Sequence, residues 1–393
     1  MRAGPSQEDI RRHNLGALLR HVHLGGPISR AELTSKMGLN RSTIMALTSD
    51  LTAAGLVREE LPRETGRAGR PSLVVRPESA RVYVFAFDVG PDRLAVARVG
   101  LGGVILDRRE VVRLRGPFEL EELAGILAGF ARQMRRKTRD DTVCVGAAAA
   151  VSGGVRKGDG VIRFGPNLGT KDVPFGEELG RRLGLGLPVS VGNDANLAAL
   201  AEHSRGVGAA VKDLIYLHGD VGIGGGIIAG GHLLGGHDGY GGEVGHMVVN
   251  PQGRPCSCGS RGCWETEIGE YALLKHAGRE HETGREAVLG VVEAAMRGDR
   301  SAQHAVRVVG DWIGFGVGNL VNIFNPEAVI FGGTLRDIYL VAAAQIRSRL
   351  NAIALPACRE HIRLRTPELG TDAALIGAAE LAFEHLLEDP LLT

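Results

Sequence analysis

The segment that decides the architecture spans residues 218–266 and reads HGDVGIGGGIIAGGHLLGGHDGYGGEVGHMVVNPQGRPCSCGSRGCWET. Three of the five cysteines, Cys256, Cys258 and Cys263, fall within eight residues, and His246 lies ten residues before the first of them. Three thiolates and one imidazole make a closed tetrahedral zinc set. The sequence therefore predicts one structural zinc ion per chain, held by these four side chains.

Two other interpretations of the cysteines were weighed against zinc. Their spacing differs from the usual pair of CxxC knuckles, although Gly259 and Gly262 relieve the tight turns that convergence requires. Free buried cysteines rarely cluster so closely. A disulfide framework fits less well, because nothing else in the chain indicates secretion and three clustered cysteines cannot all pair.

The same segment resembles the signature of the ROK family, named for repressors, open reading frames and kinases. The pattern is E-x-G-H followed by C-x-C-G-x-x-G-C-x-E, carried here by Glu243, Gly245, His246, Cys256, Cys258, Gly259, Gly262, Cys263 and Glu265. The resemblance extends from about Arg11 to the C-terminus. It implies an actin-like, ribonuclease-H-like fold of two lobes with a cleft between them.

The length and composition are those of a multidomain globular protein. A chain of 393 residues exceeds one ordinary domain, and a hydrophobic content of 44% is ample for full cores. No apolar run approaches the roughly 20 residues that a membrane span requires, and the first residues contain no apolar signal core. We therefore expect a cytoplasmic protein without a membrane partner.

The net charge of +1 hides an asymmetry along the chain. Residues 1–81 contain 13 Lys and Arg against 8 Asp and Glu, whereas the remainder contains 33 against 37. The excess of positive charge therefore lies in the first fifth of the chain. This distribution indicates a nucleic-acid partner for the N-terminal part.

Helical spacing of apolar residues in the basic region predicts a helix over 10–22, a second capped by Ser29 and Glu32, and a third capped by Asn40 or Ser42. Short strands at 56–57 and 73–75 flank LPRETGRAGRPS, whose composition is typical of a wing. The pattern favours a winged helix-turn-helix over a small helical bundle with a flexible basic loop.

The predicted DNA contacts fall into two sets. Base edges in the major groove should be read from the start of the third helix, by Asn40, Arg41, Ser42 and Thr43. Arg67 and Arg70 of the wing should enter an A·T-rich minor groove. Useful specificity requires two such domains, so we expect a homodimer or homotetramer on a near-palindromic operator. An effector would change their relative placement through a linker near Pro77.

The remainder of the chain predicts α/β structure. Two β-meanders begin near residues 82 and 213, and each places Asp-Val-Gly at the end of its first strand, at 88–90 and 220–222. Chance among abundant glycines is one explanation, and a duplicated lobe is the other. The expected domains are a winged helix-turn-helix with linker at 1–76, a first lobe at 77–194 plus 372–393, and a second lobe at 195–371.

The resemblance also implies a sugar site in the cleft, contacted by Gly153, Asn193, Asp194, Glu243, His246 and Glu265. Carboxylates suit this task because they accept bidentate hydrogen bonds from vicinal hydroxyls. His246 would give one ring nitrogen to zinc and turn the other toward the sugar. Alternatively, Asn193 and Asp194 merely cap the helix that follows them.

Phosphoryl transfer would need Asp194 as general base and two loops that cradle ATP. The family's D-x-G-x-T loop reads Asp88-Val89-Gly90-Pro91-Asp92 here, and its G-T-G-I-G-G-G loop begins Gly219-Asp220-Val221. Both loops have gained a carboxylate that repels phosphate. We therefore expect sugar binding with kinase activity lost.

The sequence as a whole indicates a transcriptional regulator, most readily a repressor, of carbohydrate metabolism that senses a sugar or sugar phosphate. A sugar kinase with an appended DNA-binding domain is the alternative from another class. A third possibility is a regulator that answers to a protein partner in place of a small molecule.

Overall fold

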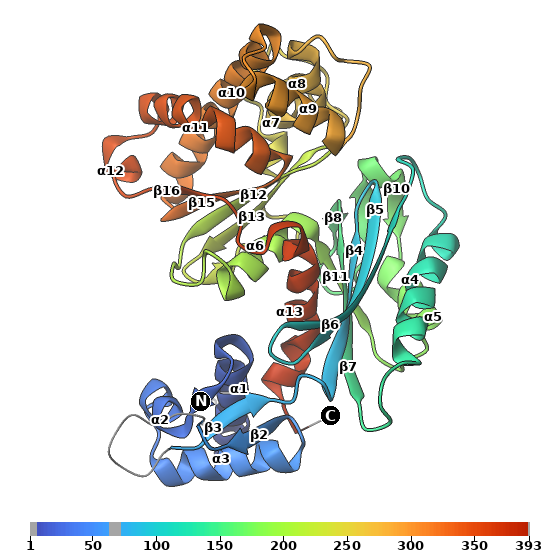
Figure 1. The fold of residues 1–393 in the computed structure, drawn as a ribbon, viewed down its shortest axis with the longest axis vertical. Coiled ribbons are helices and arrows are strands. Elements are labelled where there is room, and N and C mark those ends of the chain that lie inside the picture. The colour runs from blue at the N-terminus through green and yellow to red at the C-terminus, as the bar shows by residue number, and fades with distance from the viewer. Residues whose placement is uncertain (1–5, 63–71, 392–393) are drawn as a thin grey trace.

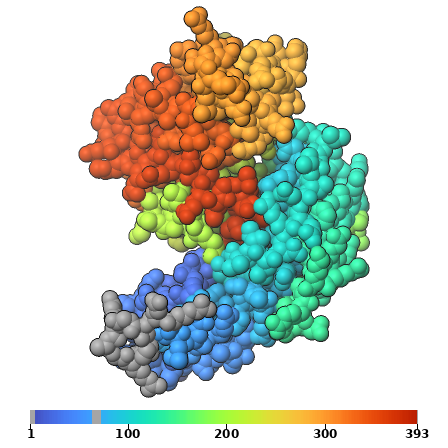
Figure 2. All heavy atoms as spheres, in the orientation of Figure 1, coloured from blue at the N-terminus to red at the C-terminus, as the bar shows by residue number. Residues whose placement is uncertain are grey.

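The computed structural model describes residues 6–62 and 72–391, which form three parts in a row. Figure 1 shows the N-terminal domain at one end, the first lobe in the middle and the second lobe at the opposite end, and the space-filling view in Figure 2 shows the same order. No helix within the described residues is long and apolar enough to cross a membrane.

The N-terminal domain is a winged helix-turn-helix, as predicted. Its elements are α1 (Gln7–Gly25), β1 (Ile28–Ser29), α2 (Arg30–Met37), α3 (Arg41–Ala53), β2 (Val57–Glu60) and β3 (Val74–Pro77). A capping box between Ser29 and Glu32 starts α2, and Asn40 rather than Ser42 is the N-cap of α3. The strands β2 and β3 pair antiparallel. The tip between them, with Arg67 and Arg70, lies outside the described residues.

The first lobe is built on a five-stranded sheet of order β11-β7-β4-β5-β6. Its elements are β4 (Val82–Val89), β5 (Arg93–Gly100), β6 (Val104–Val112), α4 (Leu120–Arg135), β7 (Val143–Val151), α5 (Phe175–Leu183) and β11 (Val189–Asn193). A small sheet of β8 (Gly154–Val155), β9 (Ile162–Gly165) and β10 (Thr170–Val173) extends from it. Apolar faces of α4 and α5 cover one side of the large sheet.

The second lobe repeats this plan with a sheet of order β14-β13-β12-β15-β16. The strands are β12 (Leu214–Gly219), β13 (Ile223–Ala229), β14 (His232–Leu233), β15 (Ala328–Gly333) and β16 (Arg363–Arg365). Its helices are α7 (Trp264–Ile268), α8 (Glu270–His276), α9 (Arg285–Met296), α10 (Arg300–Phe324), α11 (Thr334–Ile353) and α12 (Pro356–Arg359).

The two sheets have the same topology, which confirms that the lobe is duplicated. In each, the first strand of the lobe pairs antiparallel with the second and parallel with the fourth. Asp88 is the last residue but one of β4, and Asp220 directly follows β12, so both lie at the same end of the first strand of their lobe. The repeated Asp-Val-Gly is therefore structural, and the molecule is a winged helix-turn-helix followed by a two-lobed, actin-like α/β module.

Two helices lie between the parts, α6 (Asp194–Arg205) and α13 (Ala373–Glu388). The buried core of the winged domain is continuous with that of the first lobe, and α13 contributes Leu375, Phe383 and Leu386 to it. The linker expected near Pro77 is correspondingly short. The Glu78 amide donates to the Leu56 carbonyl at 2.9 Å, so the chain crosses between the two parts as ordered structure.

Candidate functional site

A pocket of about 320 Å³ opens between the lobes. Its walls come from the first lobe at the ends of β7, β9 and β11 and from the second lobe at the start of β13, η2 (Val244–His246) and α7. All six residues predicted to contact a sugar line it, namely Gly153, Asn193, Asp194, Glu243, His246 and Glu265. The structure thus brings together residues that are up to 112 positions apart in the sequence.

Asn193 both caps α6 and faces the pocket, so the two interpretations of this residue hold together. Its Oδ1 accepts from the Asn196 amide at 3.0 Å, and its Nδ2 donates to the Gly153 carbonyl at 3.1 Å. Gly153 has φ of 149°, and a Cβ there would lie 2.6 Å from the Phe164 carbonyl oxygen. Glycine is therefore required for this wall of the pocket.

Asp194 is half-buried at the start of α6, where its Oδ1 accepts from the Ala195 amide at 2.8 Å. Burial, together with the nearby carboxylates of Asp88 and Glu243, raises the pKa of Asp194 to about 7 from its ordinary value of 3.8. The hydrogen bond from Ala195 only partly offsets this rise. A carboxyl group with this pKa is only partly ionised at neutral pH.

The predicted metal ligands form one compact cluster beside the pocket. The ligand atoms of His246, Cys256, Cys258 and Cys263 all lie within 4.8 Å of one another. Two sulfurs are 3.7 Å apart, and Nδ1 of the histidine is 3.7 Å from the Cys256 Sγ. Zn–S bonds of about 2.3 Å at a tetrahedral angle place sulfurs about 3.8 Å apart, so the cluster fits a metal ion of this kind.

Glycines shape the loop that holds the cluster, as expected. Gly259 and Gly262 have φ of 93° and 71°, and a Cβ at Gly262 would overlap the Asn250 carbonyl. Cys263 is the N-cap of α7, whose first turn carries Glu265 into the pocket. The Cys256 thiol donates to Glu265 at 2.9 Å. Metal cluster and pocket are therefore joined through one short helix.

The orientation of His246 suits both of its predicted tasks. Its Nδ1 faces the cysteines, while its Nε2 lies 4.0 Å from the Glu243 carboxylate at the pocket rim. A metal bound at Nδ1 would leave the Nε2 hydrogen to bind Glu243 or a ligand.

The two loops that would cradle ATP face each other across a space of about 70 Å³. Asp88 is ion-paired with Arg93 at 2.7 Å, and Asp92 with Arg115 at 3.1 Å. Burial raises the pKa of Asp220 to about 6 although the neighbouring His218 opposes the rise. The arginines offset part of the repulsion toward phosphate, but both loops retain their added carboxylates.

Arg254 and Tyr271 are among the pocket residues that were not predicted from the sequence. The Arg254 guanidinium lines the pocket, lies 4.5 Å from the centre of the Tyr271 ring and donates to the Thr266 carbonyl. Tyr271 lines the pocket as well. Neither belongs to the quoted signature, and Arg254 could have been suspected only as the single basic residue between His246 and Cys256.

The predicted base-reading residues lie at the start of α3. Asn40, Arg41 and Ser42 are exposed, and Thr43 is half-buried. The Asn40 Oδ1 accepts from the Thr43 amide at 2.8 Å and from the Ser42 hydroxyl at 2.7 Å, so capping engages that oxygen. Arg41 has no ion pair or hydrogen bond within 6–62 and 72–391, which leaves its guanidinium available.

The fold and the pocket together define a two-lobed, sugar-kinase-like module joined to a winged helix-turn-helix. The chain belongs to the ROK family, whose model matches residues 84–385. That match begins just after the winged domain, which is therefore an addition to the part that the family shares.

Relatives are found among both regulators and kinases. The chain is 28% identical to the xylose repressor of Bacillus spizizenii, over 97% of this chain and 98% of the repressor. It is 31% identical to a glucokinase of Halalkalibacterium halodurans, over 77% of this chain and 95% of the kinase. A solved ROK family transcriptional regulator, a homologue of the E. coli Mlc protein, superposes with a TM-score of 0.80 at 26% identity and covers 98% of both chains.

Proposed function

We propose that this chain is a DNA-binding transcriptional repressor of carbohydrate metabolism that senses a sugar or sugar phosphate in the pocket between its lobes. The observation that carries the proposal is the extent of the matches. The xylose repressor and the Mlc homologue align with 97% and 98% of the chain, whereas the glucokinase aligns with 77%. The regulators thus match the winged domain as well as the lobes.

The chemistry of the pocket supports a polyhydroxylated ligand. Asp194, Glu243 and Glu265 supply carboxylate acceptors from both lobes, and Asn193 supplies an amide. Such groups pair with ring hydroxyls. The guanidinium of Arg254 on the same wall offers donors that suit the phosphate of a sugar phosphate.

The metal that we assign to the His246–Cys263 cluster is zinc. One nitrogen and three sulfur donors at these separations are the ligand set of a structural zinc site. Four protein ligands leave no open position, so the ion would brace the loop and have no part in catalysis. Its role would be to hold His246 and Glu265 at the pocket wall.

A sugar kinase with an appended DNA-binding domain is a second candidate. It is favoured by Asp194, which stands where a general base would be, and by the 31% identity to a glucokinase. The carboxylates of Asp92 and Asp220 on the phosphate loops oppose it, because each repels a bound triphosphate.

We further propose that the protein acts in the cytoplasm as a homodimer or homotetramer. Two winged domains would then meet the two halves of a near-palindromic operator.

The function is tested by titration and by an enzyme assay. An operator is first selected by the full-length protein from random-sequence DNA duplexes. D-Xylose, D-glucose, N-acetyl-D-glucosamine and their phosphate esters are then titrated calorimetrically, with and without this operator. Binding of one of them, with release of the operator, is the expected result. Sugar-dependent ATP consumption in a coupled assay, abolished by Asp194→Ala, would establish the kinase in its place.

Replacing Arg41 by alanine should weaken binding to the selected operator by about 1–3 kcal/mol and relax preference at one or two base positions, because direct readout is lost. Quantitative gel shifts against operator variants measure both effects. Arg297→Ala is the matched control, since this exposed arginine directly follows α9, which lies at the far end of the molecule from the winged domain. An unchanged base preference in Arg41→Ala would remove α3 from the reading surface.

Substitutions in the wing should change DNA binding in a different way from Arg41→Ala. Replacing Arg67 and Arg70 together should weaken binding to most sequences and flatten its salt dependence, because these residues act largely through charge. A slope of log Kd against log salt equal to that of the unaltered protein would contradict this assignment.

A further inference from the structure

A single helix connects the pocket with the winged domain. The N-cap of α6 is Asn193 and its first residue is Asp194, both in the pocket wall. Its last residue, Arg205, reaches the end of α1 in the winged domain. No local pattern in the sequence indicates this connection, because its partners are far apart along the chain.

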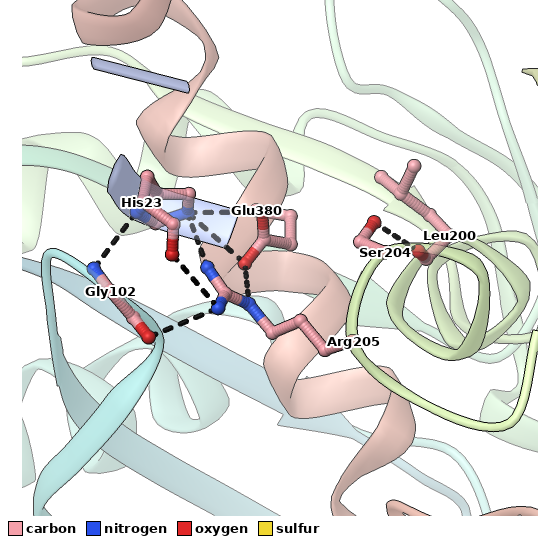
Figure 3. Close-up of polar contacts among 6 residues, drawn as sticks. All are labelled: His23, Gly102, Leu200, Ser204, Arg205 and Glu380. Atoms are coloured by element: carbon pink, nitrogen blue, oxygen red, sulfur yellow. Dashed lines mark hydrogen bonds and ion pairs between the residues drawn. The ribbon is translucent and has the colours of Figure 1, made fainter. Parts of the chain in front are cut away.

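Arg205 binds groups from three parts of the molecule (Figure 3). Its Nε donates to the Glu380 carboxylate on α13 at 2.5 Å. Its Nη1 donates to the His23 carbonyl on α1 at 3.1 Å and to the Gly102 carbonyl in the β5–β6 turn at 3.0 Å. A planar guanidinium can satisfy all three acceptors at once, and an ammonium group cannot hold the same geometry.

The groups around Arg205 determine which side chains at this junction are charged and where His23 carries its hydrogen. The Gly102 amide donates to Nδ1 of His23 at 2.9 Å, so the hydrogen of the neutral ring lies on Nε2. That nitrogen donates to the Glu380 carboxylate at 3.1 Å and also lies 2.6 Å from Nη2 of Arg205, a second donor. Burial lowers the pKa of His23. Burial alone would raise the pKa of Glu380, but the hydrogen bond from His23 and the charge of Arg205 hold it below its ordinary value. The junction is therefore a buried charged pair with a neutral histidine.

The helix α6 continues directly from β11 of the first lobe, and its first turns pack on the sheet of the second lobe. Gly224 and Gly226 of β13 let the helix lie directly on that sheet, since a Cβ at Gly224 would lie 2.9 Å from the Ala195 Cβ. Further along, α6 crosses α13 so closely that a Cβ at Gly377 would overlap the Leu197 carbonyl. The crossing lies about 4.5 Å along the helix from Asp194 and about 12 Å from Arg205, at 1.5 Å per residue.

We propose that α6 acts as a lever that transmits a ligand-dependent change at the effector pocket to the winged domain. The helix would rotate about its crossing with α13, and the hydrogen bonds of Arg205 would pass the movement on to α1. The inference rests on the proposed function and names its regulation. A sugar that touches both lobes favours one arrangement of them. Because the first turns of α6 pack on the second lobe and Arg205 binds α1 and the first lobe, a change in that arrangement displaces the end of α1. The longer arm enlarges the movement at the winged domain.

The variant Arg205→Lys tests the lever in the full-length protein. It keeps the charge beside Glu380 and loses the simultaneous bonds to His23 and Gly102. The measured quantity is the ratio of sugar Kd with and without saturating selected operator, using the sugar that binds most tightly in the titration panel. We expect a ratio of about 5 to 150 in the unaltered protein and a ratio within about twofold of unity in the variant.

Each binding event alone should change by less than about threefold in Arg205→Lys, because the residue touches neither ligand. Arg132→Lys is the control: it is the same substitution on α4, where the guanidinium donates to the Arg182 carbonyl and to no other hydrogen-bond acceptor among the described residues. A ratio in Arg205→Lys equal to that of the unaltered protein would overturn the lever. A ratio of unity in the unaltered protein itself would instead refute the proposed function.

Hydrogen exchange of the unaltered protein gives a second test that does not depend on a variant folding. The Gly102 amide is protected by its hydrogen bond to His23. If sugar binding breaks the Arg205 junction, saturating sugar should speed the exchange of this amide several-fold. Unchanged exchange at Gly102 and at the last turn of α1, in a protein whose operator affinity does respond to the sugar, would exclude the junction as the route.

Discussion

Replacing Asp194 by asparagine should weaken sugar binding by about 100-fold or more and leave operator affinity of the sugar-free protein nearly intact. The carboxylate lines the pocket, and each hydrogen bond to a charged acceptor contributes about 1.5–3 kcal/mol. Two sugar hydroxyls bound by this group therefore account for two or more powers of ten in Kd. Calorimetric titration measures the sugar Kd, and gel shifts measure the operator Kd.

The effect of pH supplies a further check on Asp194. Its pKa is raised to about 7, so the fold favours the protonated acid. The stability that this group contributes is fully present below its ordinary pKa of 3.8 and is lost as pH rises through about 7. Sugar binding has the opposite sign, because an ionised acceptor is needed. Sugar affinity should rise between pH 6 and pH 8, and this rise should be absent in Asp194→Asn.

Asp140→Asn is the matched control, because Asp140 is an exposed carboxylate in the turn before β7 and lies outside the pocket. A sugar Kd in Asp194→Asn within threefold of that in Asp140→Asn would show that the ligand binds elsewhere.

Replacing Cys258 by serine should remove the metal and the response to sugar together. Cys258 is exposed, so the serine itself fits without a packing cost. Structural zinc sites carry about 10–16 kcal/mol of apparent binding free energy in small peptides, and an ion in this cluster would join the cysteine loop to His246. Zinc content should fall from one per chain to near zero, the thermal midpoint should drop by several degrees, and sugar binding should be lost because Glu265 is released.

The control for this prediction is Cys358→Ser, which removes a half-buried thiol on α12, away from the cluster. Its zinc content should equal that of the unaltered protein. Mass spectrometry under native conditions and inductively coupled plasma analysis give the metal count. A full complement of zinc in Cys258→Ser, or none in carefully prepared unaltered protein, would contradict the assignment.

Local chemistry explains which parts of the site could be predicted from the sequence. Ser29, Asn40 and the glycines of the metal loop act within a few residues of themselves, so residue type and spacing sufficed for caps and turns. The four metal ligands lie within eighteen residues, and their donor types indicate the ion. The residues proposed to contact a sugar could be predicted only through the family resemblance, because no local pattern links Gly153 to Glu265.

The contacts that could not be predicted from the sequence are those between distant segments. His23 and Glu380 are separated by 357 positions and meet only because α13 returns to the winged domain. Arg254 owes its place in the pocket to stacking on Tyr271, which periodicity does not predict. The linker near Pro77 was expected to separate two independent parts, and the shared core shows that a boundary in sequence is not always a boundary in packing.

The position of α13 in that shared core has a consequence for biosynthesis. The helix contributes buried side chains to the winged domain and the first lobe, yet it follows about 300 residues of intervening chain. At about 5–20 residues per second, a ribosome adds these residues in about 15–60 s. During this interval the nascent winged domain exposes the face of α1 that α13 will cover. The winged domain of a nascent chain should therefore pack against α13 only once both lobes have been translated. Prematurely terminated products would lack this packing and should not compete for the operator.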